Sequence, residues 1–476
     1  MKHNKIKVLS DREVQEITEA TVRILEETGV KIDSQSSLEK LKAAGLPVDM
    51  SSGVATFPEP LLQKCLDQVP KSIDVYDRNG ERAFTIGDDN AYFASGHNAV
   101  FFDDPITGEH RQFTVREVEE YVRLSHHLED IDMIGLPASP ADVNSRSSLL
   151  YSLDAAIRLS TKPIYFSTDS EIINHFGMEM TLTAAPEASR KGAYMISQLS
   201  PTSPLFWEKG AVEGVVECAE RGFPVAILPE PIAGVSSPYS LAGLVTVHNA
   251  EALSGICITQ LPNPGTPVIW ASSWTTFDMK KSTAFVGSIE TTLARIAGAQ
   301  VAKYYNLPLH TTAPNSDNHA HDEQNSWEKT FSTYCAAAAG NDLIVNLGMY
   351  ACGMTISHEQ LVLDAEIVGQ VRRLLAGVDA STEMIGEDLI KQTGHRGTFI
   401  MADHTLNLLY GGEHRDPLIA ERGNREIWAE VGKKDTVALA RDKVRDLLTR
   451  DVPEADREIV ERVRAQITRC ELELQE

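Results

Sequence analysis

The sequence has little positive charge. It contains 44 lysines and arginines against 68 aspartates and glutamates, which gives a net charge of −24. Binding to nucleic acid needs clustered lysine and arginine side chains, so this balance argues against nucleic-acid partners and also against anionic membranes. An acidic surface is compatible with a cationic ligand, although solubility explains it more simply.

Long apolar runs and paired cysteines are also missing. No run approaches eighteen apolar residues, and residues 1–14 contain no apolar stretch typical of a signal peptide. The six cysteines are scattered without a CxxC pair, which indicates reduced and mostly buried thiols. We therefore expect a cytoplasmic protein without a membrane span.

Several familiar catalytic motifs are absent as well. No GxGxxG follows the early predicted strands, which weakens a dinucleotide-binding interpretation. The sequence has no GxSxG, and no cysteine stands beside a histidine, so nucleophilic acyl chemistry is disfavoured.

A strand–helix repeat dominates the middle of the chain. Short apolar runs, each followed by a polar turn and a helical pattern, begin near residues 132, 163, 193, 224, 267, 307 and 342, at intervals of 30 to 43 residues. Such units predict parallel strands joined by right-handed crossovers. With an eighth strand near Tyr92 or Phe399, the repeat favours a closed (β/α)8 TIM barrel over an open doubly wound sheet.

Helical segments flank this repeat. Ser10 is expected to cap a helix over Asp11–Glu27, and Thr114 and Glu117 form a predicted capping box for another helix. We expect an N-terminal helical cap over residues 1–80, a barrel over 81–400 and a C-terminal helical extension over 401–476. The charged amphipathic helices of the extension suggest a homo-oligomer.

Catalytic groups in a TIM barrel come from the C-terminal ends of the strands. Here those ends are rich in aromatic, amide and carboxylate side chains and poor in lysine and arginine, a combination that suits a quaternary ammonium ion. Most of the aromatic residues are individually more typical of a core. Trp274 is the exception, because serines and threonines flank it.

The most polar strand end is residues 308–327, which we expect to form an active-site loop. Its His319 and His321 allow an alternative, a metal-dependent TIM-barrel hydrolase, although such pairs normally follow the first strand. Glycoside hydrolysis by two carboxylates also stays open, because sequence alone does not fix the separations among the candidates, which are Glu230, Asp278, Asp317 and Glu359.

Six blocks, in order, resemble the trimethylamine methyltransferase superfamily, specifically its corrinoid-dependent members without pyrrolysine. The resemblance extends over residues 10–450. The blocks are FDDPITGE at 102–109, TKP at 161–163, SPTSPL at 200–205, NAEALSG at 249–255, DEQNSWEK at 322–329 together with Asp317, and SHEQLVLDAE at 357–366.

This resemblance implies a (β/α)8 barrel that transfers a methyl group to Co(I) of a corrinoid (cobalamin) carried by a separate protein. Members with pyrrolysine demethylate trimethylamine, and that position corresponds to residues 318–320, where ordinary residues stand here. Relatives without pyrrolysine use quaternary amines such as glycine betaine, proline betaine or carnitine. A quaternary nitrogen is already cationic, so no covalent activation is needed before the methyl group leaves. A betaine-binding protein without catalysis is a further alternative.

The expected catalytic residues are Asp317, Asn318 and His319, and no metal ligands are expected. A betaine carboxylate also needs a partner, for which His97 and His319 rank first, followed by His248, Asn318, Lys280 and Lys281. The residues expected to bind the substrate are Tyr92, Phe93, His97, Gln198, Trp270, Trp274, Phe277, Tyr350 and Glu359.

Overall fold

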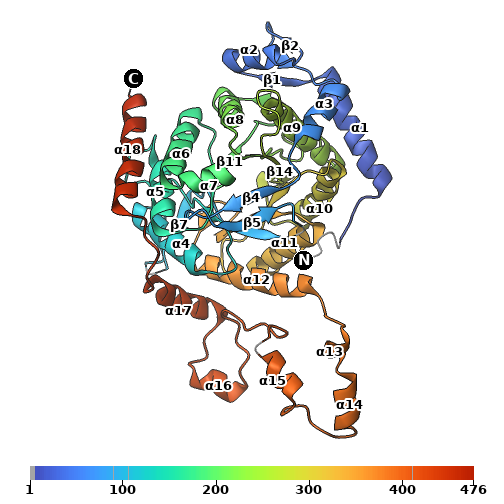
Figure 1. Cartoon of the computed structure of the whole chain (residues 1–476), viewed down its shortest axis with the longest axis vertical. Coiled ribbons are helices and arrows are strands. Elements are labelled where there is room, and N and C mark those ends of the chain that lie inside the picture. The colour runs from blue at the N-terminus through green and yellow to red at the C-terminus, as the bar shows by residue number, and fades with distance from the viewer. Residues whose placement is uncertain (1–5, 89, 106, 410, 476) are drawn as a thin grey trace.

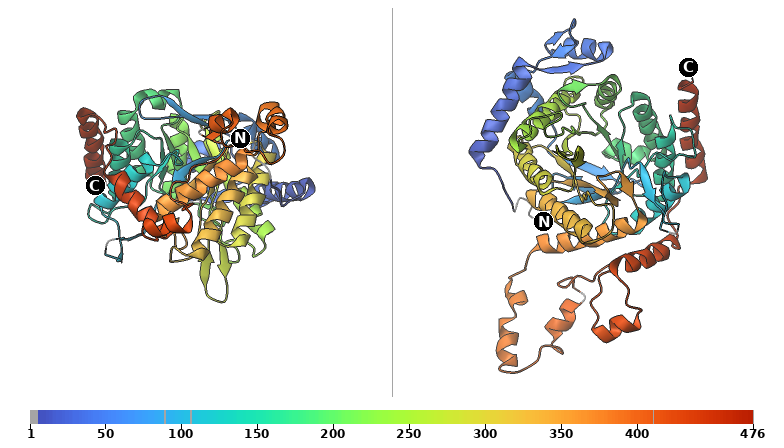
Figure 2. Two further views of the ribbon diagram at one scale, coloured as in Figure 1. Left: turned by 90° about the horizontal axis from the view of Figure 1, so that it is seen from below. Right: turned by 180° about the vertical axis from the view of Figure 1, so that it is seen from behind.

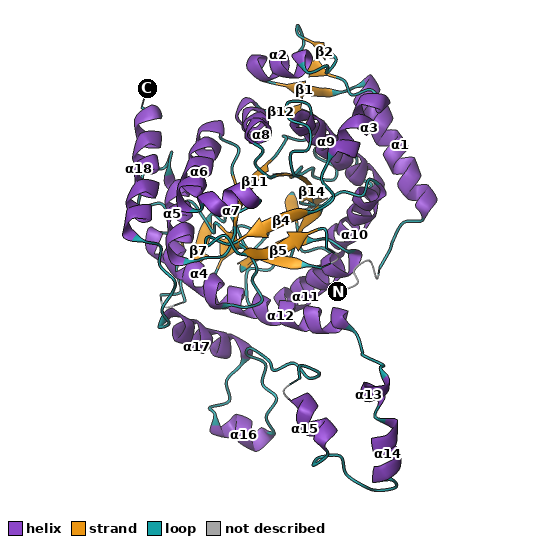
Figure 3. Ribbon diagram, viewed as in Figure 1, coloured by secondary structure: helices purple, strands orange, loops and turns teal. Residues whose placement is uncertain are grey.

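A computed structural model describes residues 6–88, 90–105, 107–409 and 411–475. Its centre is an eight-stranded parallel sheet (Figure 3) that closes through a bridge between Ala94 and Met133. The (β/α)8 prediction is therefore confirmed, with the eighth strand at Tyr92 rather than Phe399. In order of pairing, the strands are β6 (Tyr92–Ser95), β18 (Leu343–Leu347), β17 (Leu309–Thr312), β14 (Val268–Ser272), β13 (Val225–Ile227), β11 (Met195–Leu199), β10 (Ile164–Ser167) and β9 (Ile134–Gly135).

Helices surround this barrel, and side-chain caps fix many of their starts, as at Ser288, Asp322 and Ser357. Of the described helices, α9 alone is long and apolar enough to cross a membrane, and 72% of that apolar window is buried inside the protein. The helices are α4 (Val115–His127), α5 (Ser148–Leu159), α6 (Glu171–Ala184), α7 (Pro186–Lys191), α8 (Lys209–Arg221), α9 (Leu241–Gln260), α10 (Ile289–Tyr304), α11 (Glu323–Ala339) and α12 (His358–Ala376).

The N-terminal segment covers one side of the barrel. The predicted helix Asp11–Glu27 is present as α1, with the Ser10–Glu13 capping box, and it packs against α9 and α10. The rest of the segment pairs with β12 (Phe206–Trp207) through β1. Its elements are β1 (Val30–Ile32), α2 (Gln35–Ala43), β2 (Val48–Asp49), β3 (Val54–Ala55) and α3 (Glu59–Gln68).

A hairpin, β4 (Ile73–Tyr76) and β5 (Arg82–Ile86), closes the N-terminal end of the barrel. Its apolar side chains join the barrel interior, where Phe84 stacks on Tyr92 with ring centroids 4.3 Å apart. A second hairpin, β15 (Thr276–Asp278) and β16 (Thr283–Phe285), projects on the opposite side (Figure 2, left). The N-terminal end of the barrel is therefore closed, so a ligand can enter only from the C-terminal end, here called the mouth.

Two further groups of elements complete the chain. A small sheet of β7 (Phe101–Asp103), β8 (His110–Arg111), β19 (Met349–Tyr350) and β20 (Thr355–Ile356) follows two of the strand ends. After α12 the chain leaves the barrel (Figure 1) and returns through α17, which packs on α12, and α18, which packs on α6. The C-terminal helices are α13 (Thr382–Ile385), α14 (Glu387–Thr393), α15 (Asp403–Leu409), α16 (Arg425–Glu430), α17 (Thr436–Leu448) and α18 (Arg457–Glu473).

Candidate active site

Four polar side chains meet inside the barrel, above its apolar interior. Tyr165 of β10 donates a hydrogen bond from Oη to Gln198 Oε1 of β11 at 2.9 Å. The Tyr165 ring stacks on His310 of β17, with centroids 5.2 Å apart and planes inclined by 13°. His97, two residues after β6, meets the same ring edge-on at 5.3 Å. Three strands and the β6 loop thus contribute to one cluster.

The two imidazoles of this cluster favour the neutral form, and three of their four ring nitrogens lack hydrogen-bond partners among the described residues. Burial lowers the pKa of His97 to about 4 and that of His310 well below its ordinary value. Among the described residues, both ring nitrogens of His310 lack a hydrogen-bond partner, and so does Nδ1 of His97. Buried polar atoms are normally paired, so unpaired ones inside a barrel point to a ligand. A neutral imidazole offers one N–H donor and one acceptor to such a ligand.

Two carboxylates stand at the same end of the barrel, Glu230 after β13 and Asp169 after β10. The Glu230 side chain is exposed to water on one side. The protein around its carboxyl group nevertheless desolvates it, which raises its pKa, and the nearby charge of Asp169 raises that pKa further. Asp169 is likewise exposed to water on one side, while desolvation by the surrounding protein raises its pKa. Glu230 also contributes to the raised pKa of Tyr165, after burial. A raised carboxyl pKa falls again when a cation arrives, so this pair is suited to a cationic ligand.

A cavity of about 450 Å³ at this end of the barrel is lined by Asp169 and by segments that follow β6, β9 and β10. Asn98 and Ser167 lie on its wall, and Asn98 Nδ2 donates to both the backbone oxygen and the hydroxyl of Ser167 at 3.1 Å. Asp169 lines the cavity as well, which connects it to the carboxylate pair. Arg146 and several serines also line this cavity. This cavity has room for a small ligand beside Asp169.

The loop after β17 holds the three predicted catalytic residues at the rim. Asp317 Oδ1 accepts hydrogen bonds from the backbone N–H groups of Val286 at 2.8 Å and Gly287 at 3.0 Å, so this carboxylate fastens the start of α10 to the loop. Asn318 Nδ2 donates to Asp322, and His319 is exposed. None of the three belongs to the Tyr165 cluster, and their catalytic role stays a prediction.

A second polar group lies beside this loop. The Tyr350 hydroxyl donates to Asp103, and the Tyr350 ring lies 4.9 Å from that of His321. His321 Nε2 lies 3.1 Å from the Ser357 hydroxyl. Glu359 is buried and accepts a hydrogen bond from Arg441 of α17 at 3.0 Å. Phe277 is half-buried on the β15–β16 hairpin.

The hydrolase alternative finds no support in this geometry. His319 is exposed, whereas His321 is half-buried against Ser357. Nowhere in the described ranges do three or more histidine, cysteine, aspartate or glutamate side chains come together as a metal ion would require.

The structure corrects the placement of four predicted substrate-binding residues. Tyr92 lies at the lower end of β6 against the β4–β5 hairpin, and its hydroxyl donates to Asp88. Phe93 points out of the barrel and lies under Arg372. Trp270 and Trp274 are fully buried outside the barrel, toward α9 and α10. Successive residues of a strand alternate between lumen and outside, and both faces of a barrel strand are buried, so composition did not reveal the direction.

The helices behind β14 are shaped around the two tryptophans. Trp270 Nε1 donates to Asn249 Oδ1 of α9 at 3.1 Å, and the Trp274 ring packs 4.2 Å from His248. A Cβ atom at Gly298 of α10 would come within 2.5 Å of the Trp274 ring, so this glycine is required there. His248, a candidate partner for the substrate carboxylate, is itself buried and bonded through Nε2 to the Ala271 oxygen.

We expect Trp274→Ala to destabilise the protein without changing substrate affinity. Loss of a buried tryptophan costs about 3–5 kcal/mol in free energy of unfolding, because a cavity is left behind. The check is urea unfolding followed by circular dichroism, alongside KM for the substrate. A large rise in KM at unchanged stability would contradict the assignment of Trp274 to the core.

The comparison with known proteins settles the family. Residues 1–475, nearly the entire chain, match the family described as trimethylamine methyltransferase (MTTB). The chain belongs to the trimethylamine methyltransferase family. It is 30% identical over 449 residues to the trimethylamine methyltransferase of Desulfitobacterium hafniense strain DCB-2, covering 94% of this chain and 90% of that one.

Relatives of this trimethylamine methyltransferase family member carry two different substrate names. The glycine betaine methyltransferase of D. hafniense strain Y51 is 27% identical, covering 95% of this chain and 94% of that one. Among solved structures, the monomethylamine methyltransferase of Methanosarcina barkeri matches with a TM-score of 0.47 and 12% identity, covering 96% of this chain and 92% of that one.

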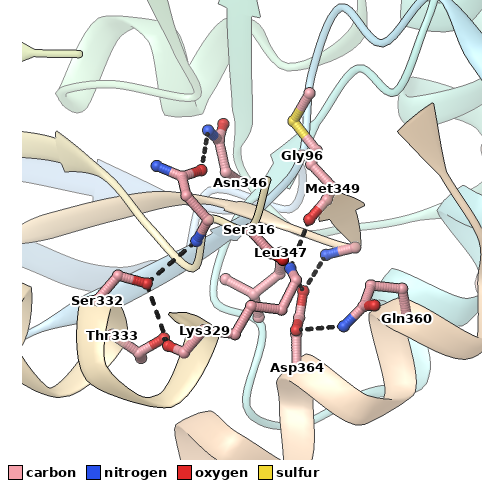
Figure 4. A network of polar contacts seen from close by, with 12 residues as sticks. Gly96, Ser316, Lys329, Ser332, Thr333, Asn346, Leu347, Met349, Gln360 and Asp364 are labelled. Atoms are coloured by element: carbon pink, nitrogen blue, oxygen red, sulfur yellow. Dashed lines mark hydrogen bonds and ion pairs between the residues drawn. The ribbon is translucent and has the colours of Figure 1, made fainter. Parts of the chain in front are cut away.

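In this family member a buried ion pair supports the strand ends around the site (Figure 4). Lys329 Nζ of α11 lies 2.8 Å from Asp364 Oδ2 of α12, and both side chains are fully buried. The same carboxylate oxygen accepts the N–H of Gly348 at 2.6 Å, and Gln360 donates to the other oxygen at 2.9 Å. The turn after β18 is thereby tied to two helices.

Asn346, at the bulge of β18, has the unusual backbone angle φ 129°. Its Nδ2 donates to Asn315 Oδ1 at 3.1 Å (Figure 4), while its own Oδ1 has no partner in the described part of the chain. Strained residues with unpaired polar atoms concentrate at functional sites, which adds Asn346 to the candidates. Nothing in the sequence pattern singles it out.

Proposed function

We propose that this protein transfers a methyl group from a small quaternary amine, glycine betaine first among the candidates, to Co(I) of a corrinoid protein. The product would be a tertiary amine such as dimethylglycine. The observation that carries this proposal is the pair of carboxylates with raised pKa values, Glu230 and Asp169, at the end of the barrel that also holds two imidazoles with lowered pKa values. A trimethylated ammonium has no N–H to donate, so charge attraction and contact with rings are what can hold it.

The residues of the pocket divide the task between the two ends of a betaine. Glu230 and Asp169 attract the ammonium, while the N–H groups of His97 and His310 and the amide of Gln198 are available to its carboxylate. A Co(I) corrinoid, when bound, supplies the nucleophile that accepts the methyl group. The protein's contribution is to hold one N-methyl toward the barrel mouth and to keep water out of the pocket. Carboxylate, amide and imidazole side chains were expected from the sequence. Of the residues in this proposal, His97 and Gln198 were among the expected substrate-binding residues, and Asp169 and His310 were not.

The rim of the mouth suits a partner that approaches from outside. Large apolar side chains are exposed on four different loops that follow the strands. They follow the carboxyl ends of the barrel strands, so a flat macrocycle on a carrier protein would find apolar contact around the barrel mouth. The exposed residues are Val100, Val235, Tyr239, Met279 and Met354. We propose that this rim receives the corrinoid protein, and that both act in the cytoplasm, where the six unbridged cysteines stay reduced.

The decisive experiment is an anaerobic spectral assay with free cob(I)alamin, and in parallel with the cognate corrinoid protein. Glycine betaine, proline betaine, carnitine and trimethylamine are offered separately, and conversion to methylcobalamin is followed. The proposal requires conversion with at least one quaternary amine. Conversion with trimethylamine alone, or with none of the four in either format, would overturn it.

The affinity for glycine betaine should increase with pH. The pKa of Glu230 is raised by burial, so at low pH the carboxyl is neutral and attracts the ammonium weakly. As the pH rises through that raised pKa, the dissociation constant should fall and then level off. Glycine betaine is useful here because its ammonium does not titrate. Calorimetric titration between pH 5 and 8 tests this; a flat profile would contradict the role of Glu230.

A further inference from the structure

One segment of the chain extends away from the barrel and has no buried side chain among its described residues. Residues 378–412, here called the arm, leave the barrel after α12 and carry α13, α14 and α15 (Figure 1). None of the arm's described residues is buried. Its three helices are each seven residues or shorter, and isolated helices of that length are marginal in water. The arm therefore needs a surface to stabilise it.

The arm is also strongly apolar for an exposed segment. Its tip, between α14 and α15, carries Phe399, Ile400 and Met401 in succession, with Ile400 72% and Met401 78% exposed. Exposed apolar patches of this kind mark interaction sites. The other large apolar side chains exposed on the arm are Val378, Ile385, Ile390, Leu406 and Leu409.

A matching groove lies on the body of the same chain. It has a volume of about 1070 Å³ and runs between α11, α12 and the segments that flank the arm. Trp327 and Phe331, one turn apart on α11, line it and are 57% and 58% exposed. Five carboxylates line the groove, and the basic Arg396 precedes the apolar tip of the arm. They are Asp322, Glu323, Glu366, Glu421 and Asp435. Groove and tip thus match in apolar character, and Arg396 beside the tip brings a cation to the acidic groove.

We propose that two copies of this chain exchange arms, so that the tip of each arm occupies the α11–α12 groove of the other copy. The arm begins at the end of α12, and the flank of α12 lines the groove. A two-fold axis beside α12 therefore lets both exchanges occur at once, forming a closed and self-complementary interface. A second copy is favoured over an unrelated partner because both halves of the contact are present on one chain. This is the self-association expected from the sequence.

Light scattering after gel filtration is the first test. The wild-type protein should run as a dimer or a multiple of two. The double variant Ile400→Asp/Met401→Asp should raise the dimer dissociation constant by roughly a hundredfold, equivalent to about 2.7 kcal/mol. The control is Leu472→Asp, another exposed apolar position, on α18, which should leave the dimer intact. A wild-type monomer, or a dimer insensitive to the tip variant, would overturn the proposal.

Cross-linking distinguishes exchange from an arm that folds back on its own chain. Ile400→Cys and Thr330→Cys are made on separate, differently tagged chains, mixed under reducing conditions and then oxidised. Exchange predicts a disulfide-linked species that contains both tags, which the wild-type cysteines do not form. The chain carrying both substitutions should also cross-link between copies when oxidised at micromolar concentration. A cross-link confined to single chains would overturn the proposal.

Discussion

Replacing Glu230 with glutamine is expected to weaken binding of glycine betaine by roughly a hundredfold while leaving kcat little changed. At a separation of about 5 Å and an effective dielectric constant of about 20, the attraction between carboxylate and ammonium is about 3 kcal/mol. That energy corresponds to roughly two orders of magnitude in the dissociation constant. Glutamine has the same shape, so the pocket itself should be preserved.

The separation of affinity from turnover follows from the chemistry. The nitrogen loses its positive charge as the methyl group departs, so a carboxylate stabilises the bound substrate more than the transition state. Removing the charge should therefore raise KM strongly, and kcat should stay level or increase. Calorimetry with glycine betaine gives the dissociation constant, and methylcobalamin formation gives kcat and KM.

The matched control is Asp278→Asn on the β15–β16 hairpin. Asp278 is also a carboxylate after a barrel strand, but it accepts hydrogen bonds from the N–H groups of Lys280 and Lys281 and lies outside the pocket. We expect its substitution to leave both constants within about twofold, because its charge lies away from the Tyr165 cluster and from the proposed position of the ammonium. Equal effects of the two substitutions would contradict the placement of the cation beside Glu230. So would an unchanged affinity in Glu230→Gln.

The barrel itself was predictable because its signal is repeated. Eight apolar runs with intervening helical patterns agree with one another, so an error in one run does not change the fold. Local helix starts were equally clear: Ser10 with Glu13, and Thr114 with Glu117, both form the capping boxes that their spacing requires. The arm was not predictable, because its short helices lack the long apolar periodicity of the barrel units.

The pocket was only partly predictable, and the reason is the direction of strand residues. His97 and Gln198 were named from sequence and lie in the Tyr165 cluster, whereas Trp270 and Trp274 point the other way. Aromatic content was the wrong signal, because tryptophan is as suited to the barrel–helix interface as to a lumen.

A better signal was present in the strands. Gln198 and His310 are polar residues inside runs that are otherwise buried on both faces. A polar side chain in such a run has to find either a partner or a ligand. That rule selects the lumen cluster, although it does not reveal that Glu230 turns back toward the pocket after β13.

Replacing Lys329 with methionine is expected to produce the largest loss of stability among single substitutions around the site. The change leaves the Asp364 carboxylate without its cation at a fully buried position, and an uncompensated buried charge costs about 3–5 kcal/mol. Because Asp364 also holds the N–H of Gly348, the turn after β18 should loosen at the same time. Urea unfolding gives the change in free energy, and the melting temperature should fall by several degrees.

The second substitution Asp364→Asn separates charge from shape. Asparagine keeps an oxygen for the Gly348 N–H but removes the unpaired charge, so Lys329→Met/Asp364→Asn should regain more than half of the lost stability. An exposed pair supplies the control: Arg12→Met, which breaks the contact with Glu16 on α1, should not measurably change the unfolding free energy. If the double variant were less stable than Lys329→Met alone, the cost would lie in packing around the lysine stem, and the ion pair would not be what holds the turn.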